Sequence, residues 1–272
     1  MKLEVLISTI DAGIEKIKKI LLPQRPDVKY IVVHQYQYDK FKYIPKELLR
    51  DDVLVTQIQG KGVTKSRNIA IHLAEGDIGF FSDDDVTYGD DYFDKVIKTF
   101  REKPGLDVAI FKIKTPDGEP EYKEYPEEAL KLEKLPFYIG TIEIAFQVKK
   151  IKEKNLHFDE RFGVGQPLLI GSDESIFVLD CIKAGLNVWY YPFYVVNHPF
   201  ESTAKLLPVY HKKKVSVTGG VDARINGWLA IPKALGGTIK LIPDLIRYKK
   251  NPFVYFYQRI KASIYILTTK SR

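Results

Sequence analysis

Short apolar runs alternate with segments of helical periodicity along the first half of the chain. The apolar runs have the length of buried strands and occupy residues 3–9, 29–35, 52–57, 78–82 and 108–114. The segments that place apolar residues at helical spacing are 13–22, 65–74 and 91–102. Strands that alternate with helices in short units predict an α/β fold, with a mainly parallel sheet flanked by helices. Because ligands bind such sheets beyond the carboxyl ends of the strands, the residues at those ends are the first candidates for a site.

The second half of the chain continues this pattern less regularly. Residues 115–136 are charged and rich in proline, which predicts loops. The elements expected after them are a strand-like stretch at 141–148, a glycine-containing loop at 159–174, a helix at 174–184 and a short strand at 187–191. Gly185 follows the expected helix in the position where glycine commonly ends one.

Charge divides the chain near residue 204. Residues 205–272 contain 14 Lys and Arg but only Asp222 and Asp244, a balance of +12, whereas residues 1–204 have a balance of −5. We therefore expect an α/β domain over residues 1–204 and a basic, amphipathic helical extension over residues 205–272. The apolar residues that recur near helical spacing in this extension are Phe253, Phe256, Ile260, Ile264 and Leu267.

Two interpretations of the basic extension stay open. Its helices could pack on the α/β domain and leave a solvated basic face, or they could lie on an anionic membrane surface. Nucleic acid would also attract this charge but is not the expected partner. The chain shows no apolar run of about 18 residues and no secretory signal pattern, and its single cysteine, Cys181, excludes an internal disulfide. We therefore expect a cytoplasmic protein, peripheral at most on the inner face of the cell membrane.

Three consecutive aspartates, Asp83, Asp84 and Asp85, follow the apolar run at residues 78–82. Neighbouring carboxylates repel one another and are costly to desolvate unless a cation lies among them. Alternate residues of an extended chain point to opposite sides, so Asp83 and Asp85 are expected on one side and Asp84 on the other. Mg²⁺ and Mn²⁺ prefer such oxygen ligands, often together with phosphate oxygens. The competing interpretation is a solvated acidic turn or a helix N-cap.

Polar residues also end two other expected strands. Ser8 and Thr9 end the first, and His34 and Gln35 end the second. Because the carboxyl ends of parallel strands meet at one edge of a sheet, these residues are expected near the three aspartates.

An ordered set of motifs extends this candidate site. The matching stretches are 60–70, which contains Lys65 and the pair Arg67-Asn68, then Ala-Glu-Gly-Asp at 74–77, 80–86 with the aspartates, Gly-Ser-Asp-Glu at 171–174, and Ala184-Gly185. Together they cover roughly residues 3–200 and resemble family 2 glycosyltransferases of the GT-A fold. The chain departs from the family pattern at two places. One is the turn Asp11-Ala12-Gly13. The other is His34-Gln35 at the end of the second strand, where the family usually has acidic residues that hold the nucleobase.

The resemblance implies transfer of a sugar from a nucleotide-diphosphate sugar, most readily a UDP-sugar, to a hydroxyl of a lipid-linked or polysaccharide acceptor, as in the synthesis of a bacterial capsule or cell envelope. It places a donor half at about 1–114 and an acceptor half at about 115–204. It implies that Mn²⁺ or Mg²⁺ is held by Asp83, Asp85 and His198. The residues implied to bind the nucleotide-sugar are Ser8, Thr9, Gln35, Lys65, Arg67, Asp83 and Asp84.

The resemblance also implies a catalytic pair. Counting back from Ala184-Gly185, the base of the family falls on Glu174, with Asp173 beside it, and the displacement would invert the anomeric carbon. The competing interpretation is that both acids favour the start of a helix through its dipole.

Two other classes of protein are alternatives to a glycosyltransferase. A sugar-phosphate nucleotidyltransferase would have a Gly/Arg-rich loop directly after its first strand, where this chain has Asp11-Ala12-Gly13. A non-catalytic membrane-binding or nucleic-acid-binding module would not need intact Asp83, Asp85 and Glu174. Both features favour the glycosyltransferase.

Overall fold

The computed structural model describes residues 1–135, 137–201 and 207–271. Pro136, which the sequence placed in a loop, and the predicted boundary at residues 204 and 205 lie outside the described residues. The chain divides into two compact units. The first consists of Met1–Phe158 and Phe177–Phe200, and the second of Asp159–Ile176 and Glu201–Arg272.

The first unit contains one mixed sheet of eight strands in the order β3-β2-β1-β4-β7-β5-β8-β6. The strands are β1 (Leu3–Ile10), β2 (Val28–Tyr36), β3 (Val53–Gln59), β4 (Ile78–Asp83), β5 (Val108–Lys114), β6 (Leu130–Lys131), β7 (Ile144–Gln147) and β8 (Val188–Asn197). Strands β1, β2, β3 and β4 are parallel to one another, and β5 is parallel to β8, whereas β7 and β6 run antiparallel to their neighbours. The α/β class and the mainly parallel sheet are thus confirmed.

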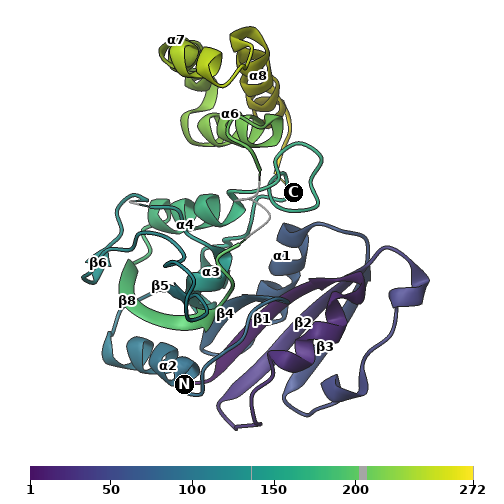
Figure 1. Ribbon diagram of the computed structural model, residues 1–272. Coiled ribbons are helices and arrows are strands. Elements are labelled where there is room, and N and C mark those ends of the chain that lie inside the picture. Colours follow the sequence, from purple (N-terminus) through teal and green to yellow (C-terminus); the bar gives the residue numbers. More distant parts are fainter. Residues whose placement is uncertain (136, 202–206, 272) are drawn as a thin grey trace. The chain divides into compact units, whose positions relative to one another are not determined.

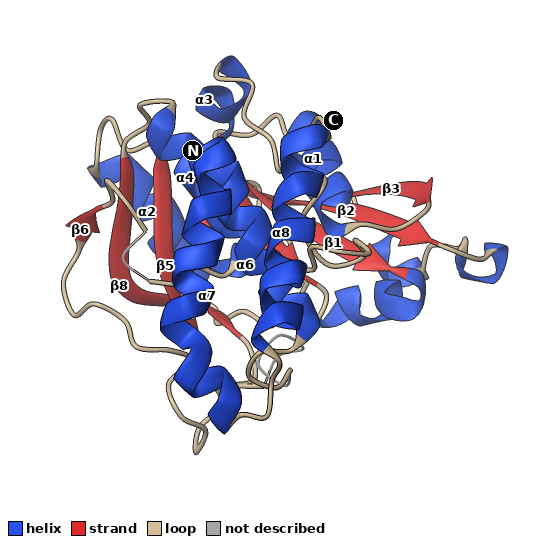
Figure 2. Cartoon of the chain, turned by 90° about the horizontal axis from the view of Figure 1, so that it is seen from above, coloured by secondary structure: helices blue, strands red, loops and turns tan. Residues whose placement is uncertain are grey.

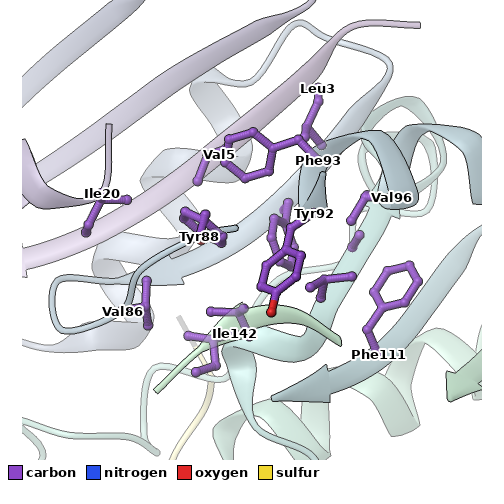
Figure 3. Packing of buried hydrophobic residues seen from close by; sticks show 14 of the residues in the cluster. Leu3, Val5, Ile20, Val86, Tyr88, Tyr92, Phe93, Val96, Phe111 and Ile142 are labelled. Carbon is purple, nitrogen blue, oxygen red and sulfur yellow. The ribbon is translucent and has the colours of Figure 1, made fainter. Parts of the chain in front are cut away.

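Helices cover both faces of this sheet (Figure 1). They are the α-helices α1 (Val63–Leu73), α2 (Tyr92–Glu102), α3 (Val148–Glu153) and α4 (Asp173–Lys183), with the short 3-10 helices η1 (Asp11–Lys19), η2 (Asp39–Phe41), η3 (Lys46–Leu48) and η4 (Thr141–Glu143). On one face, α2 and η1 pack on alternate residues of β1, including Leu3 and Val5 (Figure 3). On the other face, α1, α3 and the part of α4 that begins at Phe177 pack on Leu6 and its neighbours. Each central strand is therefore buried on both sides, as its continuous apolar sequence indicated.

Three expected elements differ from the sequence-based expectation, and in addition the short strand β6 forms within residues 115–136, which were expected to be loops. The segment 13–22 forms a 3-10 helix rather than an α-helix, because its buried residues Ile14, Ile17 and Ile20 recur every three positions. Residues 141–148 are not a continuous strand. Glu143 accepts a hydrogen bond from the backbone N–H of Gly140, which bends the chain into η4 before β7 begins.

The last strand, β8, continues to Asn197, well past the expected end at Tyr191. It contains Pro192, which cannot donate a ladder hydrogen bond. The register between β5 and β8 shifts between Ile110 and Lys112, so the proline lies at an irregularity of the pairing, where it is tolerated.

The second unit is helical. Its α-helices are α6 (Lys212–Asn226), α7 (Ala230–Arg247) and α8 (Pro252–Thr268), with the 3-10 helix η5 (Gly227–Leu229) before α7. Helices α7 and α8 lie side by side, and α6 packs against them (Figures 1 and 2). The side chain of Asn251 starts α8 by accepting hydrogen bonds from the backbone N–H groups of Phe253 and Val254. None of the helices in the described part of the chain has the length and apolar character needed to cross a membrane.

Residues 159–176 belong to this helical unit. Asp159 is 2% exposed and accepts hydrogen bonds from Arg161 and, at 3.1 Å, from Nε of Arg224 in α6. Arg161 also donates to the carbonyl oxygens of Ile266 and Thr269 at the end of α8. The sequence had assigned all of residues 1–204 to one catalytic domain, whereas these contacts group the segment 159–176 with the C-terminal helices. The catalytic role of the domain over residues 1–204 stays a prediction.

Candidate active site

The carboxyl ends of β1, β2 and β4 meet at one edge of the sheet in the first unit. In the strand register, Ser8 of β1 lies opposite Val33 of β2 and Asp83 of β4, and Thr9 lies opposite His34. Because side chains alternate along a strand, Ser8 and Asp83 point toward the face covered by α1, and Thr9 toward the face covered by η1. The polar strand ends expected from the sequence are therefore neighbours.

Asp83 forms an ion pair with a residue of α1. Its carboxylate oxygen Oδ1 accepts a hydrogen bond from Arg67, at 2.9 Å, in an ion pair in which Arg67 is almost fully buried. The Arg67 guanidinium also lies over the ring of Phe158, at 5.5 Å from its centroid. Burial raises the pKa of Asp83 above its ordinary value, an effect that Arg67 opposes and the neighbouring Asp85 reinforces. The site thus carries an excess of carboxylate charge that an added cation would relieve.

Asn68 fixes the position of this ion pair. Its side chain forms two hydrogen bonds with the backbone of Phe158, donating to the carbonyl oxygen at 3.0 Å and accepting from the N–H at 2.7 Å. The two residues therefore have different roles: Arg67 forms the ion pair with Asp83, and Asn68 connects α1 to the backbone of Phe158. Asn68 was part of the matching motif but was not predicted as a site residue.

Asp84 points to the opposite side of the strand, toward η1. Its Oδ2 accepts a hydrogen bond from the hydroxyl of Thr9 at 2.6 Å, and Oδ1 lies 3.4 Å from the ammonium group of Lys16. A Cβ atom added to Gly13 would lie 2.1 Å from that same Oδ2, so only glycine allows the carboxylate this close to the turn. Gly13 is a positioning residue that the sequence did not single out. Its only signal was a glycine shortly after the first strand.

Asp85 faces His198, which follows β8. The imidazole Nε2 lies 3.5 Å from Oδ2 of Asp85, while Nδ1 contacts the carbonyl oxygen of Pro199 at 2.6 Å. Burial by itself lowers the pKa of His198, but the hydrogen bond and the charge of Asp85 outweigh it and raise the pKa above its ordinary value. The same hydrogen bond lowers the pKa of Asp85.

The Asp85–His198 pair has the donor chemistry of a partial metal site. The carbonyl oxygen of Pro199 can only accept a hydrogen bond, so Nδ1 carries the hydrogen and Nε2 is the ligand atom of the neutral imidazole, beside a carboxylate that is 56% exposed. Within the described residues there is no group of three or more His, Cys, Asp or Glu side chains arranged to hold a metal ion. A cation here would therefore depend on further oxygen ligands from a bound substrate.

Two buried polar atoms at the same sheet edge have no hydrogen-bond partner among the described residues. They are Oγ of Ser8, which is 7% exposed, and Nε2 of Gln35, which is 3% exposed. Buried polar groups are normally paired, so these two atoms are suited to contact a bound ligand. By contrast, His34 is engaged at both ring nitrogens, with the carbonyl oxygen of Asp11 at 2.9 Å and Nε2 of Gln57 at 3.0 Å. His34 thus orders the turn that follows β1.

The remaining predicted residues lie elsewhere. Lys65 is exposed on α1, and in the described part of the chain it makes no ion pair. Asp173 and Glu174 form the acidic first turn of α4 and are 2% and 4% exposed. They belong to the second unit, whereas the aspartates at the end of β4 belong to the first. Their catalytic role stays a prediction.

Comparison with known proteins identifies the class. The model of Glycosyl transferase family 2 matches residues 4–164, more than half of the chain. The chain therefore belongs to this family and is a glycosyltransferase. The nucleotidyltransferase and the non-catalytic module considered from the sequence do not agree with this membership. Enzymes of this family often use divalent metals. A search of curated protein sequences found no match.

Solved structures of S. aureus TarS share the fold. The structure of TarS 1-349 in complex with UDP has a TM-score of 0.58 and 16% identity, and the one in complex with UDP-GlcNAc has a TM-score of 0.56 and 17% identity. Both matches cover 84% of this chain, which spans 66% and 67% of those two chains and 40% of full-length TarS. A mycobacterial protein matches with a TM-score of 0.54 and 15% identity over 82% of this chain and 74% of its own. At these identities the likeness establishes the GT-A fold alone.

Proposed function

We propose that this glycosyltransferase moves a sugar from a UDP-sugar to a hydroxyl of a lipid-linked or polysaccharide acceptor, with inversion and with the help of Mn²⁺ or Mg²⁺. The observation that carries the proposal is the arrangement of Asp83, Asp84 and Asp85, whose carboxylates are oriented by three different parts of the first unit. TarS, which has the same fold, has been crystallised with UDP and with UDP-GlcNAc, and this supports a uridine nucleotide as the donor.

The diphosphate belongs at the exposed end of β4. Asp85 and His198 would hold the metal there, with Asp83 as the adjacent negative charge and diphosphate oxygens completing the ligand set. The metal would supply Lewis-acid stabilisation of the departing diphosphate. Arg67 neutralises part of the charge of Asp83 and is suited to phosphate through its planar guanidinium. Lys65 is exposed on the same helix and would add a second positive charge.

The nucleoside belongs beside β1 and β2. The unpaired Oγ of Ser8 and Nε2 of Gln35 would contact it, and Asp84 would accept a hydrogen bond from a ribose or sugar hydroxyl. Thr9 orients Asp84 through its 2.6 Å hydrogen bond.

The acceptor hydroxyl needs a base, because an alcohol barely ionises at neutral pH. We assign this role to Glu174, with Asp173 beside it as an acceptor-binding or positioning group. The acceptor oxygen attacks the anomeric carbon while Glu174 takes its proton. The bond between that carbon and the diphosphate oxygen breaks on the opposite side, so the electron pair leaves with UDP and the configuration inverts.

Thermal stabilisation tests the donor site. UDP together with Mn²⁺ should raise the melting temperature of the full chain more than UDP alone. Asp85→Asn should abolish this metal-dependent part and turnover, while Asp90→Asn, an exposed aspartate on the same loop, should preserve both. Normal activity of Asp85→Asn would remove the argument for a metal at this position. A panel of nucleotide-sugars, assayed for metal-dependent release of the nucleotide, would identify the donor.

A second variant tests the base. Glu174→Gln should still be stabilised by UDP and Mn²⁺ but should lose transfer, because the amide cannot accept the proton. Asp180→Asn, in the same helix, is the matched control. If Glu174→Gln retained full activity, the base would have to be another residue.

We further propose that the enzyme works in the cytoplasm at the inner face of the membrane. The support is the balance of +12 in residues 205–272, which would attract an anionic surface or an acceptor that carries phosphate.

A further inference from the structure

Helix α7 exposes a continuous apolar stripe. Its members are Leu235, Ile239, Ile242 and Ile246, which are between 36% and 65% exposed. Their spacing of four, three and four residues places them on one face of the helix. At 1.5 Å per residue the stripe is about 16 Å long. The sequence had drawn attention to α8 instead, where Leu267 turns out to pack against the core of the second unit.

A basic stripe runs along the same helix. Lys233, Lys240 and Arg247 are spaced by seven residues, which brings each nearly above the last, and all three are exposed. The buried side of α7 is a third face, separate from both stripes, and is formed by Ala230, Ala234, Thr238 and Leu245. Helix α7 therefore has a packed side, an apolar exposed side and a cationic side.

Neighbouring elements extend this exposed surface. Phe253 and Tyr257 of α8 are 84% and 61% exposed, and Trp228 of η5 is 67% exposed. The buried residues of α8, which include Tyr255, Arg259 and Ala262, lie on the opposite side of that helix. Figures 1 and 2 show α7 and α8 side by side with α6 on one side of the pair. Both helices of the pair thus carry exposed apolar residues, and α7 carries exposed basic residues as well.

Acidic residues hardly offset this charge. Residues 205–272 contain two acids. Asp222 forms an ion pair with Arg259, which is only 6% exposed, and Asp244 accepts a hydrogen bond from the hydroxyl of Tyr210 at 3.2 Å. The charge of Asp222 is thus balanced inside the unit, whereas Asp244 is exposed on α7 and keeps its charge. With Lys233, Lys240 and Arg247 it leaves α7 with a balance of +2.

We propose that the outer surface of α7 and α8 binds a lipid bilayer that contains anionic lipids. Large aliphatic and aromatic side chains would enter the boundary between headgroups and acyl chains, and the basic stripe would contact lipid phosphates, as in helices that lie in the plane of a membrane. A second copy of the chain would present the same positive charge and be repelled. Nucleic acid would match the charge but would leave the isoleucine stripe in water. The proposal rests on the membrane location proposed above and names the surface responsible for it, and it does not depend on the identity of the donor or the acceptor.

Vesicle binding by the full chain tests the proposal. We expect the protein to sediment with vesicles of phosphatidylcholine and phosphatidylglycerol but not with vesicles of phosphatidylcholine alone. Lysine or arginine near an anionic surface contributes about fivefold in affinity per residue, so the triple change Lys233→Gln, Lys240→Gln and Arg247→Gln should weaken binding about 100-fold. The pair Ile239→Ser and Ile246→Ser should weaken it by about tenfold per residue.

Matched controls separate this surface from general charge and hydrophobicity. Lys18→Gln, Lys19→Gln and Lys29→Gln remove three exposed lysines from the first unit, and Leu49→Ser with Leu54→Ser removes two exposed leucines. Both controls should bind anionic vesicles as the unchanged protein does. The fluorescence of Trp228 should shift to shorter wavelength on binding, and Trp228→Phe should lose that shift without losing binding.

Three results would overturn the proposal. They are no binding to anionic vesicles at low salt, binding that the α7 variants leave unchanged, and a dimer in solution that the isoleucine variants dissociate. Thermal stabilisation by UDP and Mn²⁺, measured without vesicles, should be unaffected in the α7 variants. A failure of the membrane proposal is therefore distinguishable from a failure of the donor proposal.

Discussion

The substitution Gly219→Ala tests the packing of α6 on α8. In an exposed helix this change stabilises a protein by about 0.5–1 kcal/mol, because alanine loses less conformational entropy than glycine on folding. In this chain a Cβ at residue 219 would lie 2.3 Å from the carbonyl oxygen of Arg259 and 2.8 Å from its Cα atom. Both atoms belong to the backbone of α8, so a side chain cannot simply turn aside.

The structure indicates which effect is larger. Ordinary contact begins near 3.4 Å, so α6 and α8 would have to separate locally by roughly the missing ångström. Overpacking of this kind costs about 1–3 kcal/mol. The movement would also stretch the 2.9 Å hydrogen bond from Ser263 to the carbonyl oxygen of Gly219, which contributes about 1 kcal/mol. We therefore expect Gly219→Ala to destabilise the protein by about 1–3 kcal/mol.

Gly236→Ala is the matched control. Gly236 lies in α7, is exposed, and has no atom within 4 Å of the position that its Cβ would take. This variant should stabilise the protein by about 0.5–1 kcal/mol. Urea titration of the full chain, followed by the circular dichroism of its helices, compares the two variants at constant temperature. Equal stability of Gly219→Ala and the unchanged protein would refute the close packing of α6 on α8.

Three further predictions concern the side chains of Asp159 and Asn68. Asp159→Asn should destabilise the protein by about 3–5 kcal/mol, measured by urea titration, because Arg161 and Arg224 would lose a buried partner. Burial alone would raise the pKa of Asp159, but the two arginines lower it below its ordinary value of about 4. The ionised Asp159 therefore stabilises the folded state fully at pH values above the ordinary pKa, and this stabilisation is lost as the pH falls toward the lowered pKa. The unchanged protein should consequently lose more stability than Asp159→Asn between pH values of about 5 and 3. Asn68→Ala should cost about 2 kcal/mol, read from the melting temperature, because the N–H and carbonyl of Phe158 lose their partner, while Lys65→Ala should change stability little.

The central strands could be predicted from the sequence because they are buried on both faces. Runs such as Leu3–Ile10 and Ile78–Asp83 are mostly apolar until their polar carboxyl ends, and two-sided burial is what such runs indicate. The order of the strands was not predictable in the same way. Strand β7 inserts between β4 and β5 and runs antiparallel to both, and no local pattern in Ile144–Gln147 specifies that partner.

The site was predictable to the extent that it depends on strand ends. Ser8, Thr9 and Asp83 lie together because the strand register brings them together, and Asp84 faces away from Asp83 because side chains alternate. The contacts made across long distances in sequence were not predictable. A glycine after the first strand does not by itself indicate contact with Asp84, and no local pattern indicates the pairing of Asn68 with Phe158.

The ion pairs around Asp159 indicate where the protein could be truncated. A chain cut after Phe200 would retain the whole of the family match, which ends at residue 164. In the shortened chain Asp159 would nevertheless lose its ion pair with Arg224. Arg161 would lose its hydrogen bonds to the two carbonyl oxygens at the end of α8. The loop leading to Glu174 would then lose its anchorage. The terminal helices are in this sense part of the minimal enzyme rather than a dispensable tail.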